Sequence, residues 1–129
     1  MTLRAKILGG TLAAGAAIVF AAGPATAGTD VYVDTTDPFN SAAAGFKAYG
    51  EIFTVCDNRA DGMRASGHIG WTDSSASHWV PLEDTNGANN SCARKDLSIG
   101  EGIPVTVQIC VKNGANGDPK YCAIKHGKA

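Results

Sequence analysis

Several features that would assign a function are missing from this sequence of 129 residues. It contains no Cys-x-x-Cys or His-x-x-x-His pair of the kind that holds zinc, and no Gly-x-Ser-x-Gly motif of a serine hydrolase. Beyond position 27, no stretch shows helical periodicity over three turns, and none is apolar enough to span a bilayer. We therefore expect no metal site, no cofactor and no membrane-spanning segment in that part of the chain.

The N-terminus has the three parts of a secretory signal peptide. Arg4 and Lys6 precede an apolar, alanine-rich stretch at 7–22, and Pro24 then leads into Ala25-Thr26-Ala27. A membrane anchor is the alternative, but glycines and a threonine dilute the apolar stretch. We expect cleavage after residue 27, which leaves a secreted, extracellular domain of residues 28–129.

Clustered positive charge is also missing. Without Arg4 and Lys6, nine of the 11 basic residues remain against 12 acids, so the expected mature chain has a net charge of −3. Nucleic-acid binding depends on a basic surface that replaces phosphate counterions. We therefore expect no nucleic-acid partner.

Period-two alternation of apolar and polar residues predicts β-strands. The longest such run is 103–112, where Ile103, Val105, Val107, Ile109 and Val111 share one face. Shorter runs occur at 30–34, 53–56 and 96–99, and turn dipeptides such as Asp-Gly and Asn-Gly separate the runs. The stretch 41–47 is expected to be a loop or a single turn, and 72–77 and 84–91 to be loops. The pattern predicts an all-β fold, a small antiparallel β-sandwich of the Ig-like or Greek-key type.

The four cysteines are expected to form two disulfides, because an even count in a short exported chain is typical of a disulfide framework. If Val111 faces Tyr121 across a hairpin, Cys110 lies opposite Cys122, which leaves Cys56 for Cys92. An in-register hairpin through 100–102 would instead pair Cys92 with Cys110. We favour the first arrangement, with every cysteine on the face opposite the large aliphatic residues of its strand.

The chain resembles a group of small exported, cysteine-containing β-proteins from filamentous actinobacteria. The resemblance covers about residues 50–123 and rests on the run Gly50-Glu-Ile-Phe-Thr-Val-Cys-Asp57, on Asp61-Gly62, Asp96-Leu97 and Glu101-Gly102, and on Gln108-Ile109-Cys110 followed by Cys122. It implies a signal peptide, a compact β-sandwich and a bridge between the last two strands at Cys110 and Cys122. It implies no activity.

Motifs with chemical potential each have a simpler interpretation. The run 57–62 has some oxygen donors of a calcium loop, but Arg59 stands at its third position, and a tight turn with positive φ at Gly62 explains it better. Glu51, Arg64 and His126 could serve a small ribonuclease, yet such a set occurs in almost any chain. His68 and His78 lack a convincing third zinc ligand. We therefore name no catalytic residue and no metal ligand.

The two tryptophans of the expected domain have different predicted positions: Trp79 is a candidate for a binding surface, and Trp71 is a candidate for the core. The parity of Val80 and Leu82 would put Trp79 on the outer face, where an indole can stack on a sugar ring or anchor an interface. Alternatively, Pro81 breaks the strand and Trp79 packs inside, and we favour this second interpretation. Trp71 shares the parity of Ile69 and is expected in the core.

Protease inhibition is the main alternative function, since such inhibitors present one rigid loop. The loop 84–94, anchored by Cys92, and the turn at Arg59 are the candidate loops, with Arg59 and Arg94 as candidate specificity residues. We expect a non-catalytic binding protein whose partner is an extracellular protein or polysaccharide. Trp79, Arg59 and Arg94 are its candidate surface residues.

Overall fold

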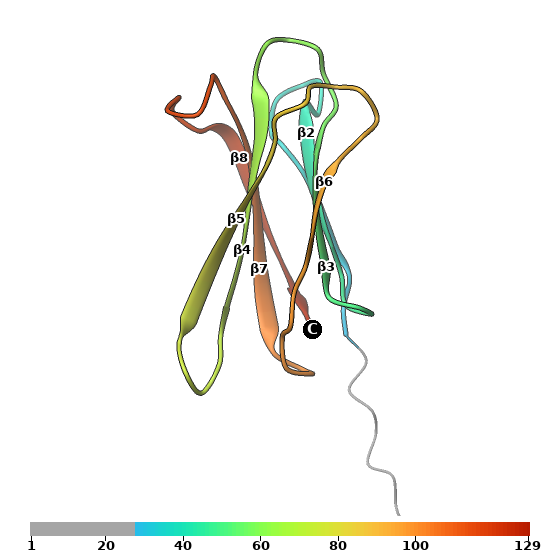
Figure 1. Cartoon of the computed structure of the whole chain (residues 1–129), viewed down its shortest axis with the longest axis vertical. Helices are drawn as coiled ribbons and strands as arrows, with labels where there is room; N and C mark the ends of the chain where they lie inside the picture. The colour runs from blue at the N-terminus through green and yellow to red at the C-terminus, as the bar shows by residue number, and fades with distance from the viewer. Residues whose placement is uncertain (1–27) are drawn as a thin grey trace, which may run out of the picture.

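Alternating burial along the strands builds two antiparallel sheets that face each other across one apolar core. The computed structural model describes residues 28–129, and the expected signal peptide lies outside this range. The first sheet has the order β1-β2-β3-β6 and consists of Val31–Asp34, Ala42–Lys47, Ile52–Asp57 and Ala93–Asp96. The second has the order β5-β4-β7-β8 and consists of Ser77–Asp84, Arg64–Thr72, Pro104–Lys112 and Lys120–Lys128. The predicted all-β sandwich is confirmed (Figure 1).

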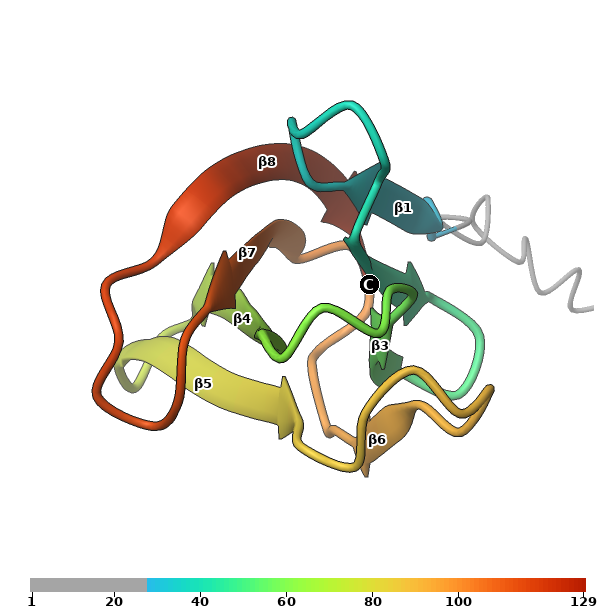
Figure 2. The same ribbon diagram turned by 90° about the horizontal axis from the view of Figure 1, so that it is seen from above.

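The core lies between the sheets and is filled from both sides. Five large side chains expose at most 1% of their surface: Phe46 and Phe53 of the first sheet, and Ile69, Val107 and Ile109 of the second. Burying a side chain of this size contributes about 2 kcal/mol. Seen from above, β5, β4, β7 and β8 lie on one side of the molecule, and β1, β3 and β6 lie on the other (Figure 2). No helix in the described part of the chain is long and apolar enough to cross a membrane.

The connections cross between the sheets as in Greek-key sandwiches. β3 pairs with β6 and β4 pairs with β7, so each sheet contains one pair of strands that are distant in sequence. Loops therefore gather at the ends of the sandwich, and each sheet keeps one outer face that the other sheet does not cover.

The expectation of a loop or turn at 41–47 is wrong, because this segment forms strand β2. Its alanines have little intrinsic strand preference, so the sequence gives a weak signal. Strands on both sides complete its hydrogen-bond ladder, and Ala42, Ala44 and Phe46 point into the core. Tertiary pairing thus decides the conformation of this segment.

The alternation at 96–99 predicts a strand that continues to residue 99, but β6 ends at Asp96. Beyond this point, two hydrogen bonds to Glu51 hold the chain in place of strand pairing. The Glu51 backbone oxygen accepts a hydrogen bond from Leu97 N at 2.9 Å, and its Oε2 accepts one from Ile99 N at 3.1 Å. A side chain therefore stabilises the segment that the pattern assigns to a strand.

The disulfides are Cys56–Cys92 and Cys110–Cys122, as expected. The hairpin register differs in detail: Val111 faces Lys120 rather than Tyr121, because a bulge interrupts the β7–β8 ladder. The bulge leaves Cys110 and Cys122 within bonding reach, although Cys110 is almost fully buried on its outward side. Two disulfides are compatible with an extracellular protein.

Candidate functional site

Trp79 lies on the outer face of the second sheet, away from the core. β5 continues without a break through Pro81, which faces His68 of β4. The strand survives because β5 is at the sheet edge, where proline is tolerated. The strand parity holds, 52% of Trp79 is exposed, and the favoured expectation that Trp79 packs inside is wrong.

Two neighbours on β4 hold the indole ring in place. Gly70 faces Trp79 in the register, and a Cβ at position 70 would collide with the six-membered ring of the indole. The ring is also parallel to the imidazole of His68, with 9° between the planes and 5.2 Å between the centroids. An exposed indole is thus fixed by contacts within its own sheet.

Polar groups share this outer face with Trp79. Thr106 follows Gly70 in the same row across the sheet, and His126 follows Thr106. The Thr106 hydroxyl and His126 Nδ1 are 3.0 Å apart. In the adjacent row, Gln108 lies between His68 and the exposed Ile124. The face therefore combines flat apolar surface with groups that can form hydrogen bonds. We call it the Trp79 face; its members are Trp79, His68, Thr106, Gln108, Ile124 and His126.

Beside the Trp79 face, the β4–β5 hairpin extends past the last pair that β4 forms with β7 (Figure 1). Trp71 and His78 stack on this extension, with 17° between the planes and 4.5 Å between the centroids. A hollow of about 400 Å³ lies here, lined by Gly70, Trp71, Thr72, Ser77, His78, Trp79, Pro104 and Thr106. Trp71 is only partly buried and packs at the margin of the core, so the expected core position is met in part.

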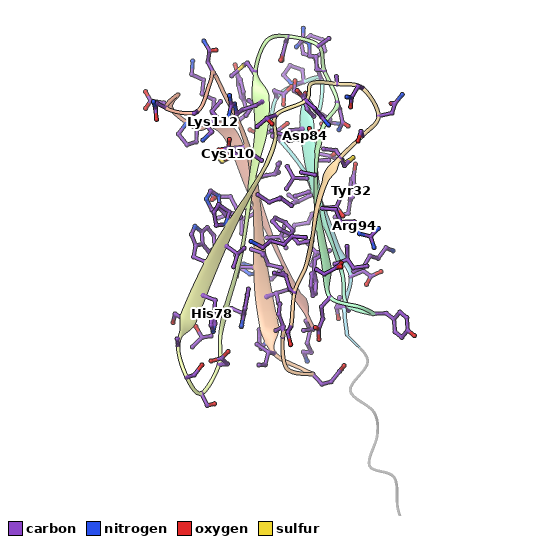
Figure 3. All side chains as sticks on the ribbon, viewed as in Figure 1. Tyr32, His78, Asp84, Arg94, Cys110 and Lys112 are labelled. Carbon is purple, nitrogen blue, oxygen red and sulfur yellow. A yellow bond between two sulfur atoms is a disulfide. The ribbon has the colours of Figure 1, made fainter. Side chains whose placement is uncertain are left out.

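Asp73 fixes the tip of the hairpin. Its carboxylate accepts hydrogen bonds from the Ser75 hydroxyl and from the backbone N–H groups of Ser75 and Ala76. These bonds hold the pKa of Asp73 well below its usual range. His78 Nε2 lies 2.9 Å from Asp73 Oδ2, so the ring that lines the hollow is held by a charged carboxylate. Figure 3 shows His78 near the end of this hairpin.

The electrostatics of the Trp79 face keep His68 neutral. Burial lowers the pKa of His68, and the nearby Lys112 ammonium lowers it further, while Glu83 opposes the shift. Glu83 itself is bound by Lys112 and by Arg64 Nη1, the latter at 3.1 Å. Among the residues that the structure describes, His68 Nδ1 has no hydrogen-bond partner. Two cations therefore share one carboxylate at this border, and the lowered pKa of His68 favours the uncharged imidazole beside Trp79.

Arg59 and Arg94, the other predicted surface residues, lie elsewhere. The Arg59 guanidinium lies 3.8 Å from the ring centroid of Phe39 at one end of the sandwich. Arg94 belongs to β6, faces Thr54 and points to the outer side of the first sheet (Figure 3). Arg59 lines a hollow together with Thr85, Gly87 and Ala88 of the 84–94 loop, whereas Arg94 lies in strand β6, so the structure brings only Arg59 beside that loop.

Glu51, Arg64 and His126 are not brought together. Glu51 bonds to Ile99 near the first sheet. In the second sheet, Arg64 faces Lys112 and His126 faces Thr106, at opposite ends of β7. At about 3.3 Å per residue, six residues of strand separate these positions by about 20 Å. The three groups cannot act on one bond.

The segment 57–62 is an inter-strand turn, as the simpler interpretation states. Gly62 has φ = 77°, and Asp61 Oδ1 accepts a hydrogen bond from Met63 N. Asp57 is buried, and its backbone N–H donates to Asp84 Oδ2 at 2.9 Å. Over residues 28–129, no group of three or more His, Cys, Asp or Glu side chains is arranged to hold a metal ion.

Two features of the structure have little signal in the sequence: the role of Gly70 as the seat of Trp79, and a trough on the first sheet around Gly45. Glycine weakens a strand interior and marks places where another group approaches closely. Both glycines stand inside strands, so their positions were the available signal.

Comparisons with protein-family models, with curated proteins and with solved structures each find no significant match.

Proposed function

We propose that this protein is an exported, non-catalytic binding protein that holds a polysaccharide on the Trp79 face. The observation that carries the proposal is the fixed and exposed indole of Trp79. A half-exposed indole leaves apolar surface in water, which burial against a ligand would stabilise. Because Gly70 and His68 already hold the ring, binding costs little side-chain entropy.

A sugar ring fits this face better than a wholly apolar ligand does. One side of a pyranose is apolar and can lie against an indole, while its hydroxyl groups need hydrogen-bond partners. Thr106, Gln108 and His126 supply such partners on the same face, and the hydroxyls of Thr72 and Ser77 lie 3.0 Å apart at the adjoining hollow. Small numbers of placed polar groups beside an apolar surface are typical of ligand sites.

The charged groups at the border of the Trp79 face favour an uncharged polysaccharide as the ligand. Glu83 is paired with Arg64 and Lys112 at the border of the face, and the pKa of His68 is lowered by burial and by Lys112. Two cations share one carboxylate at this border, which leaves one positive charge in excess, so the face lacks the cluster of free cations that a polyanion needs. A neutral glucan, xylan or chitin suits it better than a polyanion.

Export is the second part of the proposal. The first 27 residues have the pattern of a secretory signal, and two disulfides are compatible with an oxidising compartment. Mass spectrometry of protein recovered from culture medium tests it: we expect Gly28 as the first residue and four oxidised cysteines. Retention of Met1 in that material would contradict it.

Tryptophan emission can test the binding proposal directly. In a Trp71→Phe background, Trp79 is the only tryptophan of the 28–129 domain. We expect soluble glucan, xylan or chitin oligomers to shift its emission saturably, and pull-down on the insoluble polymers to retain the protein. Trp79→Ala should weaken retention about thirtyfold, because truncating an aromatic anchor costs about 2 kcal/mol.

Tyr49→Ala is the matched control, since Tyr49 is 98% exposed in a turn and truncating it should leave retention unchanged. If no polysaccharide shifts the emission, or if Trp79→Ala is retained as well as the parent, the proposal is wrong. Capture of a protein rather than a glycan through Trp79 would also contradict it.

A further inference from the structure

The outer face of the first sheet carries a trough that follows strand β2. Its floor is Gly45 and Ala43, the small outward residues of that strand. Tyr32 of β1, 61% exposed, forms one wall, and Thr54 and the disulfide-bonded Cys56 of β3 form the other. Asp30 and Lys47 close one end, and the trough encloses about 320 Å³. Figure 3 shows Tyr32 on the side of this sheet that faces away from the other sheet.

Gly45 has no evident structural reason to be glycine. Its φ is not positive, so the backbone conformation is open to any residue. A Cβ would lie 3.7 Å from Val31 O and 4.0 Å from Tyr32 Cδ2, which are ordinary contact distances. Glycine inside a strand costs about 0.5–1 kcal/mol relative to alanine. Glycine at position 45 therefore lowers the stability of the strand, and no packing contact of the strand requires it.

Gly70 in the opposite sheet, by contrast, is glycine because of a contact within the molecule. There, the ring of Trp79 occupies the space that a side chain would take. At Gly45 the Tyr32 ring comes no nearer than 4.0 Å to the position of a Cβ, so it borders this space without filling it, and an open trough remains. A missing side chain that is not explained by packing is expected where a ligand approaches the backbone closely.

The size and charge of the trough define the ligand. The volume of about 320 Å³ lies at the lower end of the range for small-molecule sites. Lys47 Nζ, at the closed end, is paired with Asp30 Oδ2 at 3.0 Å, so the trough offers no free charge there. Burial raises the pKa of the Tyr32 phenol, and the charge of Asp34 and a hydrogen bond to it raise that pKa further. The phenol is thus shared with Asp34, and the Thr54 hydroxyl on the other wall is the group that can donate a hydrogen bond to a ligand.

We infer that the trough along β2 binds a small, flat, uncharged, largely apolar molecule with a hydrogen-bond acceptor, placed over Gly45 between Tyr32 and Thr54. This site is separate from the Trp79 face, because it lies on the outer side of the other sheet. It does not depend on the proposed polysaccharide binding.

The test uses prodan, a neutral two-ring fluorescent dye that carries a carbonyl group. We expect saturable binding with a blue shift of the dye emission. Gly45→Val adds a side chain that projects into the trough, so it should weaken binding at least tenfold while the melting temperature stays equal or rises. Unchanged affinity in Gly45→Val would overturn the inference.

Two further variants and a second dye make the result specific. Trp79→Ala should leave prodan binding unchanged; a loss in that variant would place the dye on the Trp79 face and overturn the inference. Anilinonaphthalene sulfonate, an anionic dye of similar size, should bind at least tenfold more weakly than prodan, and equal binding would contradict an uncharged ligand. Sedimentation equilibrium completes the test, because a dimer that Gly45→Val dissociates would show that a second copy of the chain fills the trough instead.

Discussion

The indole ring of Trp79 lies directly over the backbone of Gly70, and the missing side chain of the glycine creates the space that the ring fills. The pair joins an edge strand to its neighbour on the outer face of the sheet. It converts a mobile surface tryptophan into a fixed one, which is the property on which the proposed polysaccharide binding depends.

Gly70→Ala should therefore displace Trp79 and destabilise the domain by about 1–3 kcal/mol, the usual cost of overpacking. Gly45→Ala is the matched control, since the same methyl group would make only ordinary van der Waals contacts there and should stabilise the strand by about 0.5–1 kcal/mol. Urea unfolding of the two variants measures the difference, and Trp79 emission reports the displacement. Equal stabilities would contradict the role of Gly70 as the seat of the ring.

His68 gives the Trp79 face a dependence on pH. Burial and Lys112 lower the pKa of His68, so the folded protein binds fewer protons than the unfolded chain below pH 6.5. The free energy of unfolding should fall as the pH drops below 6.5 and level off below the folded pKa. NMR titration of the His68 ring should give a midpoint below 6.5, and His68→Gln should remove this part of the pH dependence. A midpoint at or above 6.5 would contradict the burial of this ring.

Much of the fold follows from local patterns, because a strand with one buried face alternates in sequence. The run 103–112 predicts β7, and its alternation also places Cys110 toward Cys122. β2 could not be predicted this way, since its alanines are neither β-branched nor aromatic and its conformation depends on β1 and β3.

The candidate site depends more strongly on tertiary context. Pro81 is a strand breaker in the middle of a sheet and is tolerated at an edge, so the exposure of Trp79 depends on where β5 lies. Sequence parity places Trp79 correctly once that position is known. The empty space over Gly45 depends on three strands in register and has no signal within β2 alone beyond the glycine itself.

Glu51 provides a third test, because the structure gives this candidate catalytic carboxylate a structural role. Its Oε2 accepts the hydrogen bond from Ile99 N that fixes the segment after β6. Glu51→Ala should destabilise the domain by about 1–2 kcal/mol, since it leaves a partly buried N–H without its partner. Glu101→Ala, in an exposed turn, is the control and should be neutral in thermal unfolding. A fully stable Glu51→Ala variant would show that the hydrogen bond is unimportant.

Asp37 controls the loop between β1 and β2. Its buried carboxylate accepts hydrogen bonds from the hydroxyls of Thr35 and Ser41 and from the backbone N–H groups of Phe39 and Ser41. Burial alone would raise the pKa, but the hydrogen bonds from Ser41 and Thr35 outweigh it and lower the pKa to about 2. The folded pKa thus lies below the unfolded value, so this carboxylate stabilises the fold above about pH 4 and loses that contribution as the pH falls toward 2.

Asp37→Asn should lower the free energy of unfolding at pH 7 by about 2 kcal/mol, because hydrogen bonds to a charged acceptor are stronger than those to an amide. The gap between the variant and the parent should close as the pH approaches 2, since the parent then loses its charge as well. Asp118→Asn, at an exposed position, is the control and should match the parent at pH 7. Chemical unfolding at pH 7, 4 and 2.5 measures the three stabilities. A gap of constant size across this range would mean that the ionised carboxylate of Asp37 does not hold the loop, and that the loop keeps its conformation by packing alone.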